Sequence, residues 1–171
     1  MTTRPMAIEE EGGEERIEPF VRSRLFTNLF SGGMALVEET AAYLDDEGRK
    51  ASRDLSREGA LAYAGTSMRL TTRLMQIASW LLVLRAVREG EMTPAEARDD
   101  KYRIGPAERR PVGDPGEGMP EPLQSLIAQT DTLYARITRL DRDLFMSEPT
   151  QPEPEDAIGQ QRALRDAFGG L

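Results

Sequence analysis

The side chains of this sequence that could do chemistry are arginines and carboxylates, because the chain contains no histidine and no cysteine. That composition excludes disulfides, zinc fingers and every nucleophilic triad that needs His or Cys. Among the remaining polar residues, Arg69 and Arg73 are four positions apart and so share one face of a helix. Glu38 and Glu39 lie on an earlier segment that we expect to run alongside. The sequence therefore predicts no metal and no cofactor, and it indicates a charged surface instead.

These four charged residues allow two interpretations. They could form ion pairs between neighbouring helices at the surface of a helical bundle, where each pair contributes little to stability. They could instead form a docking patch for a protein partner or an anionic ligand, because guanidinium groups bind carboxylates with two parallel hydrogen bonds. Under the second interpretation the candidate partner-binding residues are Glu38, Glu39, Arg69 and Arg73.

A small helical enzyme is the alternative function. A dimer of the chorismate-mutase type surrounds a dicarboxylate with arginine, glutamate and glutamine side chains and needs neither His nor Cys. Such a pocket could be built here from Glu38, Arg69, Arg73 and Gln76. However, the positions between these arginines and beyond them carry leucine and isoleucine, which are typical of packed core. We therefore expect a non-enzymatic protein.

The balance of charged and apolar residues narrows the classes of function further. Charged residues make up 30% of the chain, hydrophobic residues 39%, and the formal net charge is −8. A net-acidic protein approaches phosphates against its own field, so we expect no nucleic-acid binding. The most apolar stretch, residues 74–87, falls short of the roughly 20 residues that span a bilayer. With no visible export signal, we expect a cytoplasmic protein without membrane insertion.

Acidic residues concentrate at the two ends of the chain. Residues 1–18 hold six glutamates against two arginines, and residues 147–171 hold five acidic residues against two arginines, with three prolines. Such segments bury too little apolar surface to order themselves, so both are predicted to be disordered. Residues 19–146 are nearly neutral and form the predicted folded domain.

The first predicted helix covers residues 20–44, where apolar side chains recur at helical spacing. Gly32 and Gly33 lie inside it. Each glycine costs about 1 kcal/mol relative to alanine in a helix interior. We attribute the pair to a kink or to the close approach of a neighbouring helix rather than to a ligand site. Gly48 is predicted to end the helix in a left-handed conformation.

A second, longer helix is predicted to start at Ser52 or Asp54 and to end at Glu89, where Gly90 stops it. Its second half is apolar nearly all round, which indicates burial on more than one side. The residues TPAE at 93–96 form a capping box that begins a short further helix.

The third long helix is predicted over residues 123–145. Between it and the preceding short helix, residues 105–122 hold five prolines and four glycines, so this stretch is predicted to be an irregular loop. No segment shows the alternation that a strand requires. The expected fold class is therefore all-α, an antiparallel three-helix bundle with disordered termini.

The unequal helix lengths predict a homodimer. The second helix is expected to be roughly 57 Å long and the first roughly 38 Å, at 1.5 Å per residue. Another subunit would cover the excess length most economically. We place Leu81 and Leu84 in this dimer interface.

The last residues of the chain differ from the Pro- and Glu-rich stretch before them. Ile158, Leu164 and Phe168 can line one side of a short helix. A disordered tether that ends in an amphipathic peptide is typical of a docking element, and a frayed tail without a function is the competing interpretation. We add these three residues to the candidate partner-binding set.

Two long blocks of the sequence resemble a known family. The blocks are GGMALVEETAAYLDDEGR (residues 32–49) and YAGTSMRLTTRLMQIASWLLVLRAVREGEM (residues 63–92). They closely resemble the regulator-of-CtrA-degradation family, RcdA, of alpha-proteobacteria. The resemblance covers about the middle half of the chain, and the terminal segments and residues 105–122 match weakly.

The resemblance implies a function that composition does not show. Members of this family are homodimeric three-helix bundles that act as non-enzymatic adaptors of the ClpXP protease. They act with the response regulator CpdR, which primes the ClpX unfoldase. They also act with PopA, a cyclic di-GMP effector, to deliver the cell-cycle regulator CtrA and other substrates for degradation, and they gather at the cell pole. By resemblance, we expect a proteolysis adaptor with these kinds of partners.

Overall fold

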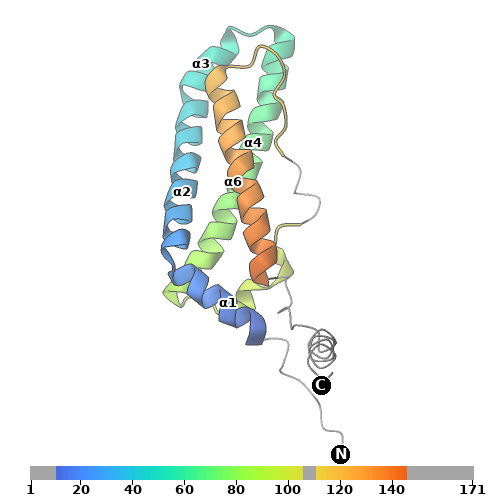
Figure 1. The fold of residues 1–171 in the computed structure, drawn as a ribbon. Helices are drawn as coiled ribbons and strands as arrows, with labels where there is room; N and C mark the ends of the chain where they lie inside the picture. The colour runs from blue at the N-terminus through green and yellow to red at the C-terminus, as the bar shows by residue number, and fades with distance from the viewer. Residues whose placement is uncertain (1–10, 106–110, 146–171) are drawn as a thin grey trace, which may run out of the picture.

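Three long helices form the body of the molecule in the computed structural model, which describes residues 11–105 and 111–145. They are α2 (Arg24–Asp45), α4 (Arg57–Glu89) and α6 (Glu121–Phe145), and they pack side by side along their lengths (Figure 1). The described residues contain no strand. The predicted all-α class and the three-helix bundle are therefore confirmed.

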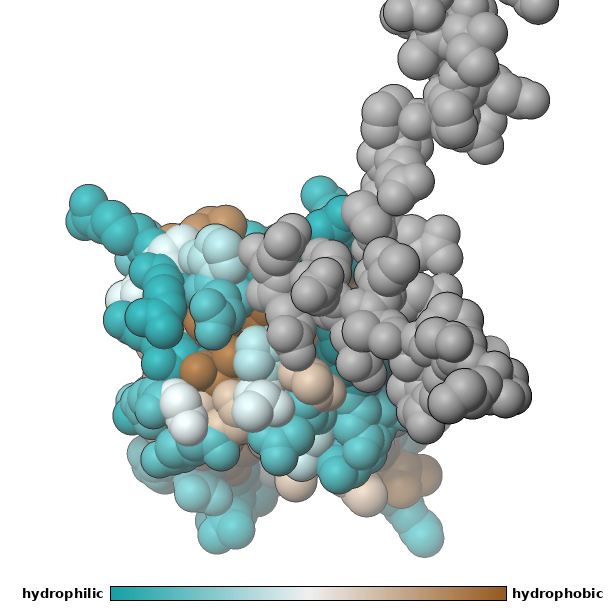
Figure 2. Space-filling view, turned by 90° about the horizontal axis from the view of Figure 1, so that it is seen from below, coloured by the Kyte–Doolittle hydropathy of each residue, from teal (hydrophilic) through white to brown (hydrophobic). Residues whose placement is uncertain are grey.

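A shorter helix, α1 (Glu11–Arg22), crosses the lower end of the bundle (Figure 1). Ile17 and Val21 of α1 are fully buried, and the helix packs against α2, α4, α5 and α6. The folded part of the chain therefore begins before the predicted boundary at residue 19. Ile17, which lies within the acidic segment, and Val21 just after it anchor this helix to the bundle. Seen from this end, the surface is mostly hydrophilic around a small apolar area (Figure 2). Residues 1–10 lie outside the described part of the chain.

The start of α2 and its glycines follow from local chemistry. Ser23 caps the helix by accepting a hydrogen bond from the Phe26 N–H with its side chain. The helix then runs through Gly32 and Gly33 without a break. A Cβ atom on Gly33 would lie 2.5 Å from Leu81 Cδ1. The predicted close approach of a neighbouring helix is therefore confirmed at Gly33.

The connection between α2 and α4 differs from the prediction. Gly48 does not end α2 in a left-handed conformation; it lies buried within a separate short helix, α3 (Glu47–Arg53). A side chain there would collide with the Tyr63 hydroxyl and the Tyr43 ring. The cap of α4 is Ser56, which accepts a hydrogen bond from the Gly59 N–H, rather than Ser52 or Asp54. Ser52, Asp54 and Ser56 could each cap a helix, so their local sequence does not show where α4 begins.

The end of α4 follows the sequence closely. Gly90 caps it in the left-handed conformation, with φ of 76°. Thr93 and Glu96 then form the predicted reciprocal capping box that begins α5 (Pro94–Ala97). The hydrogen bonds from Thr93 lower the pKa of the Glu96 carboxyl below its usual value of 4.5. A 3₁₀ turn, η1 (Asp100–Tyr102), completes this corner.

The direction of α6 departs from a fully antiparallel bundle. Arg73 and Trp80 of α4 contact Tyr134 and Asp141 of α6, so residues seven apart on one helix meet residues seven apart on the other in the same order. Helices α4 and α6 are therefore parallel, and α2 is antiparallel to both (Figure 1). This topology requires a return segment between η1 and α6 that brings the chain from the end of α4 back to the opposite end of the bundle.

The last part of that return segment, residues 111–120, is packed onto the bundle rather than loose. Val112 and Met119 are buried. The Val112 N–H donates to Asp131 Oδ1 over 2.8 Å, and its carbonyl accepts from Arg69 Nε over 3.3 Å. Both backbone groups of Val112 are therefore satisfied by side chains of α6 and α4, as buried polar groups require. We call residues 111–120 the strap.

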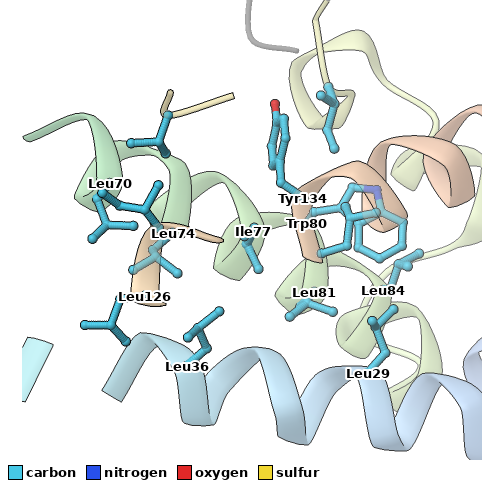
Figure 3. Close-up of a cluster of buried hydrophobic side chains, with 14 of the residues drawn as sticks. Leu29, Leu36, Leu70, Leu74, Ile77, Trp80, Leu81, Leu84, Leu126 and Tyr134 are labelled. Carbon is cyan, nitrogen blue, oxygen red and sulfur yellow. The ribbon is translucent and has the colours of Figure 1, made fainter. Parts of the chain in front are cut away.

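The core lies between the three long helices. Each supplies apolar side chains to it (Figure 3): Leu29 and Leu36 from α2, Leu70, Leu74, Ile77, Trp80, Leu81 and Leu84 from α4, and Leu126 and Tyr134 from α6. By length and composition alone α4 could cross a membrane, which is a weak indication because the core helix of a bundle meets the same criterion.

Candidate protein-interaction surfaces

The arginines that the sequence marked as a docking patch are used inside the chain. Arg69 donates to the Val112 carbonyl and to Thr66 Oγ1, over 3.3 and 3.0 Å. Arg73 is buried, with its guanidinium carbon 3.8 Å from the centre of the Tyr134 ring and its Nη1 3.2 Å from Gln76 Oε1. Both arginines therefore hold the strap and α6 against α4, and a role in binding a partner stays a prediction.

The two glutamates of that predicted patch are both exposed on α2, but they differ in surroundings. Glu39 lines a cavity between α2 and α6, whereas Glu38 lines neither that cavity nor the one that adjoins it. The structure thus separates two adjacent residues that the sequence could not distinguish.

A buried polar cluster that sequence analysis missed joins α4, α6 and the α5–η1 corner. Asp141 Oδ1 accepts hydrogen bonds from Trp80 Nε1 at 2.8 Å and from Arg103 Nη1 at 2.6 Å. Arg103 also donates to the Ala97 carbonyl and stacks on the Phe145 ring. Burial lowers the pKa of Arg103 below its ordinary value, against the opposing effect of Asp141. The cluster fixes the corner of the fold, and its hydrogen-bonding groups are used within the chain.

The predicted dimer interface needs a correction. Leu81 and Leu84 have no exposed surface, because both pack against helices of their own chain. Neither side chain can therefore contact a second subunit while the bundle stays folded. The sequence pattern marked them as apolar, which core and interface residues share, so it could not assign them to one of the two.

The exposed apolar residues of α4 lie on the opposite face of that helix. They are Leu61, Met68, Met75 and Leu82, with exposed fractions of 76, 72, 65 and 48%. We call this set the α4 stripe. Its members are seven residues apart, the repeat of a coiled-coil seam. This strict seven-residue spacing is the signal in the sequence for an external apolar face. It separates the residues of the stripe from the core residues that lie between them in the sequence.

A groove runs between α2 and α6, on a face of the bundle away from the α4 stripe. Its apolar part is a cavity of about 490 Å³ with Leu29, Gly32, Gly33 and Leu36 on one side and Ala128, Thr132 and Leu133 on the other. Asn28 belongs to the α2 side of the lining and Arg136 to the α6 side. The lining is mainly apolar and lacks buried charged groups, as expected for a surface that receives a side chain rather than a polar metabolite.

The groove continues towards the C-terminal end of α2 and the N-terminal end of α6. A second cavity of about 560 Å³ is lined by Glu39, Tyr43, Asp46 and Glu47 from the α2–α3 side and by Pro122, Ser125 and Leu126 from α6. Gln129 lines both cavities, so they adjoin. We call the two together the α2–α6 groove.

The structure offers no support for the enzyme alternative. Neither cavity of the α2–α6 groove is lined by Arg69, Arg73, Gln76 or Glu38. Arg73 and Gln76 are bonded to each other beside Tyr134. Within the described residues no group of acidic side chains has the arrangement of a metal site. The tail residues Ile158, Leu164 and Phe168 lie outside the described part of the chain.

Comparison with known proteins places the chain in a family. A family model described as "Protein of unknown function (DUF1465)" matches residues 17–168. The crystal structure of RcdA from Caulobacter crescentus CB15 has 50% sequence identity to the chain and a TM-score of 0.65. That match covers 77% of this chain and 99% of the RcdA chain. No match is found among curated proteins. The resemblance to RcdA seen in residues 32–49 and 63–92 is thus confirmed, and it extends over nearly the whole of the RcdA chain. The chain belongs to the DUF1465 family.

Proposed function

We propose that this protein is a non-enzymatic proteolysis adaptor that tethers substrates to a primed ClpXP protease. The observation that carries the proposal is the 50% identity to RcdA over 99% of the RcdA chain. Because this identity extends over nearly the whole RcdA chain, a common kind of partner is expected. The proposed partners are ClpX, a CpdR-like response regulator, a PopA-like cyclic di-GMP effector and a CtrA-like substrate.

The physics of such a role matches the surfaces of the bundle. An adaptor raises the effective concentration of a substrate near the protease and needs no reactive group of its own. It does need two surfaces that can be occupied together. Because the α4 stripe and the α2–α6 groove are built from different faces of the helices, a second copy bound at the stripe would leave one groove open on each subunit. We place the protein in the cytoplasm, with recruitment to the cell pole as part of the same proposal.

A homodimer through the α4 stripe is part of this proposal and replaces the interface at Leu81 and Leu84. If two copies of α4 pair antiparallel about a twofold axis between Thr71 and Thr72, Leu61 lies opposite Leu82 and Met68 opposite Met75. The same register brings exposed Glu58 opposite Arg85 of the second copy. Apolar and charged positions are thus both matched by one symmetry operation, which supports a self-complementary interface.

Reconstituted degradation tests the adaptor role. Purified ClpXP and a CpdR-like regulator from the same organism are incubated with a CtrA-like substrate and the PopA-like effector, with and without this protein. We expect the substrate half-life to fall several-fold when the protein is present and to return when the regulator is left out. An unchanged half-life with every component active would show that the protein is not the adaptor. A chorismate turnover assay on the same sample is expected to show no activity.

A further inference from the structure

The α2–α6 groove has a graded chemistry along its length. Arg136 stands beside the apolar cavity, and Glu39, Asp46 and Glu47 stand around the other one. All four charged side chains are exposed at the rim. A ligand that lies along the groove therefore meets a cation first, then an apolar floor, and then a group of carboxylates. This order can select both the composition and the direction of a bound peptide.

Gly32 lies in the floor of the groove and has no role in the packing of its own chain. No atom lies within 4 Å of the position that its Cβ would take, whereas a Cβ on the adjacent Gly33 would strike Leu81. An exposed glycine within a helix is unfavourable relative to alanine. Gly33 is thus explained by the core, and Gly32 is explained if something outside the chain approaches the α2 backbone at this point.

We propose that the α2–α6 groove binds an extended segment of a partner protein that carries an apolar side chain and, about five residues away, a lysine or arginine. The apolar side chain enters the cavity beside Gly32, and the basic side chain lies among Glu39, Asp46 and Glu47. This deepens the proposed adaptor function by naming the chemistry of one partner segment, and it rests on that function only for the partner's role.

The spacing follows from helix geometry. Gly32 and Tyr43, which mark the two cavities on α2, are eleven residues apart, or roughly 16 Å at 1.5 Å per residue. An extended peptide advances roughly 3.3 Å per residue, so about five residues cover that distance. Arg136 lies at the other side of the apolar cavity, which favours an acidic residue, or a terminal carboxylate, close to the apolar anchor.

Selection from a displayed library of random 12-residue peptides, with the full-length protein as bait, tests this proposal. We expect the selected sequences to share a leucine, methionine or phenylalanine and a basic residue about five positions from it. A synthetic copy of a selected peptide is then bound to the protein, and its dissociation constant is measured by fluorescence anisotropy. Backbone amide shifts of Gly32 and Gln129 in NMR spectra are expected to move on binding.

Matched variants on α2 locate the binding site. Gly32→Leu fills the apolar cavity, and Ala41→Leu adds the same side chain at an exposed position of α2 that lines neither cavity. Glu39→Lys reverses a charge in the groove, and Glu38→Lys does so one residue away, outside it. We expect Gly32→Leu and Glu39→Lys to weaken binding at least tenfold, and the two controls to change it less than twofold. Circular dichroism checks that all four variants keep their helix content.

Three outcomes contradict the proposal. The library yields no binder; or its binders lack the basic residue; or the groove variants bind the peptide as well as their controls do. None of these depends on a protease, so they are separate from failure of the degradation assay. A protein that binds these peptides but leaves substrate half-life unchanged would keep the groove proposal and reject the adaptor function.

Discussion

For some residues of this protein, packing within the chain explains why that residue type is present, and for others it does not. Gly33, Gly48 and Asp141 belong to the first group, since each is buried and in contact with a defined neighbour. Gly32 and Glu39 belong to the second, because both are exposed in the wall of the α2–α6 groove. Residues of the second group are the better candidates for function.

The two adjacent glycines of α2 give the sharpest prediction at this scale. Gly32→Ala should stabilise the bundle by about 0.5–1 kcal/mol, because alanine loses less backbone entropy and open space surrounds the new methyl group. Gly33→Ala should destabilise it by about 1–3 kcal/mol, because the methyl group overlaps Leu81. Chemical denaturation of the two variants and the parent measures both effects. Equal changes in both variants would contradict this account of the two positions.

At the scale of the helix, α4 has two apolar faces with different tasks. One face, with Leu81 and Leu84, is the core of the bundle. The other is the α4 stripe, which is exposed in the single chain. Residues of the stripe alternate along the sequence with residues of the core. The second half of α4 is therefore apolar nearly all round.

Charge substitutions on the two faces should have different consequences. Met75→Glu, in the stripe, should give a folded monomer, because its side chain is 65% exposed in the single chain but would meet Met68 across the proposed twofold axis. Leu81→Glu should unfold the bundle instead, since an unpaired carboxylate in the core is strongly destabilising. Size-exclusion chromatography with light scattering gives the mass, and circular dichroism gives the fold. The exposed substitution Glu91→Gln, beyond the end of α4, is the control. A stable Met75→Glu dimer would exclude the stripe as the interface.

For the whole molecule, the parallel arrangement of α4 and α6 depends on a return segment whose last part is the strap. The strap is held by Asp131 and Arg69 at Val112, so the arginine that the sequence suggested as a docking residue helps to fix the strap on the bundle. The consequence for function is that, among residues 11–105 and 111–145, none covers the α4 stripe on the outer face of α4 or fills the α2–α6 groove.

These two surfaces should act independently, because no residue belongs to both. We expect the monomeric Met75→Glu variant to bind a groove peptide within twofold of the parent's dissociation constant, and the Gly32→Leu variant to keep the parent's dimer mass. Fluorescence anisotropy and light scattering on the same samples measure the two quantities. Loss of peptide binding on monomer formation would mean that the groove is completed by the second copy.

The sequence by itself determined the helical class, the three long helices, the cap at Gly90 and the capping box at Thr93 and Glu96, because these depend on local spacing and on hydrogen bonds between near neighbours. It also carried the family resemblance. Only the tertiary structure decided the direction of α6, the roles of Arg69 and Arg73, and which apolar residues of α4 are core and which are exposed. Those properties depend on contacts between residues far apart in the chain, and an apolar or charged side chain has the same local pattern whether its neighbour is its own fold or a partner.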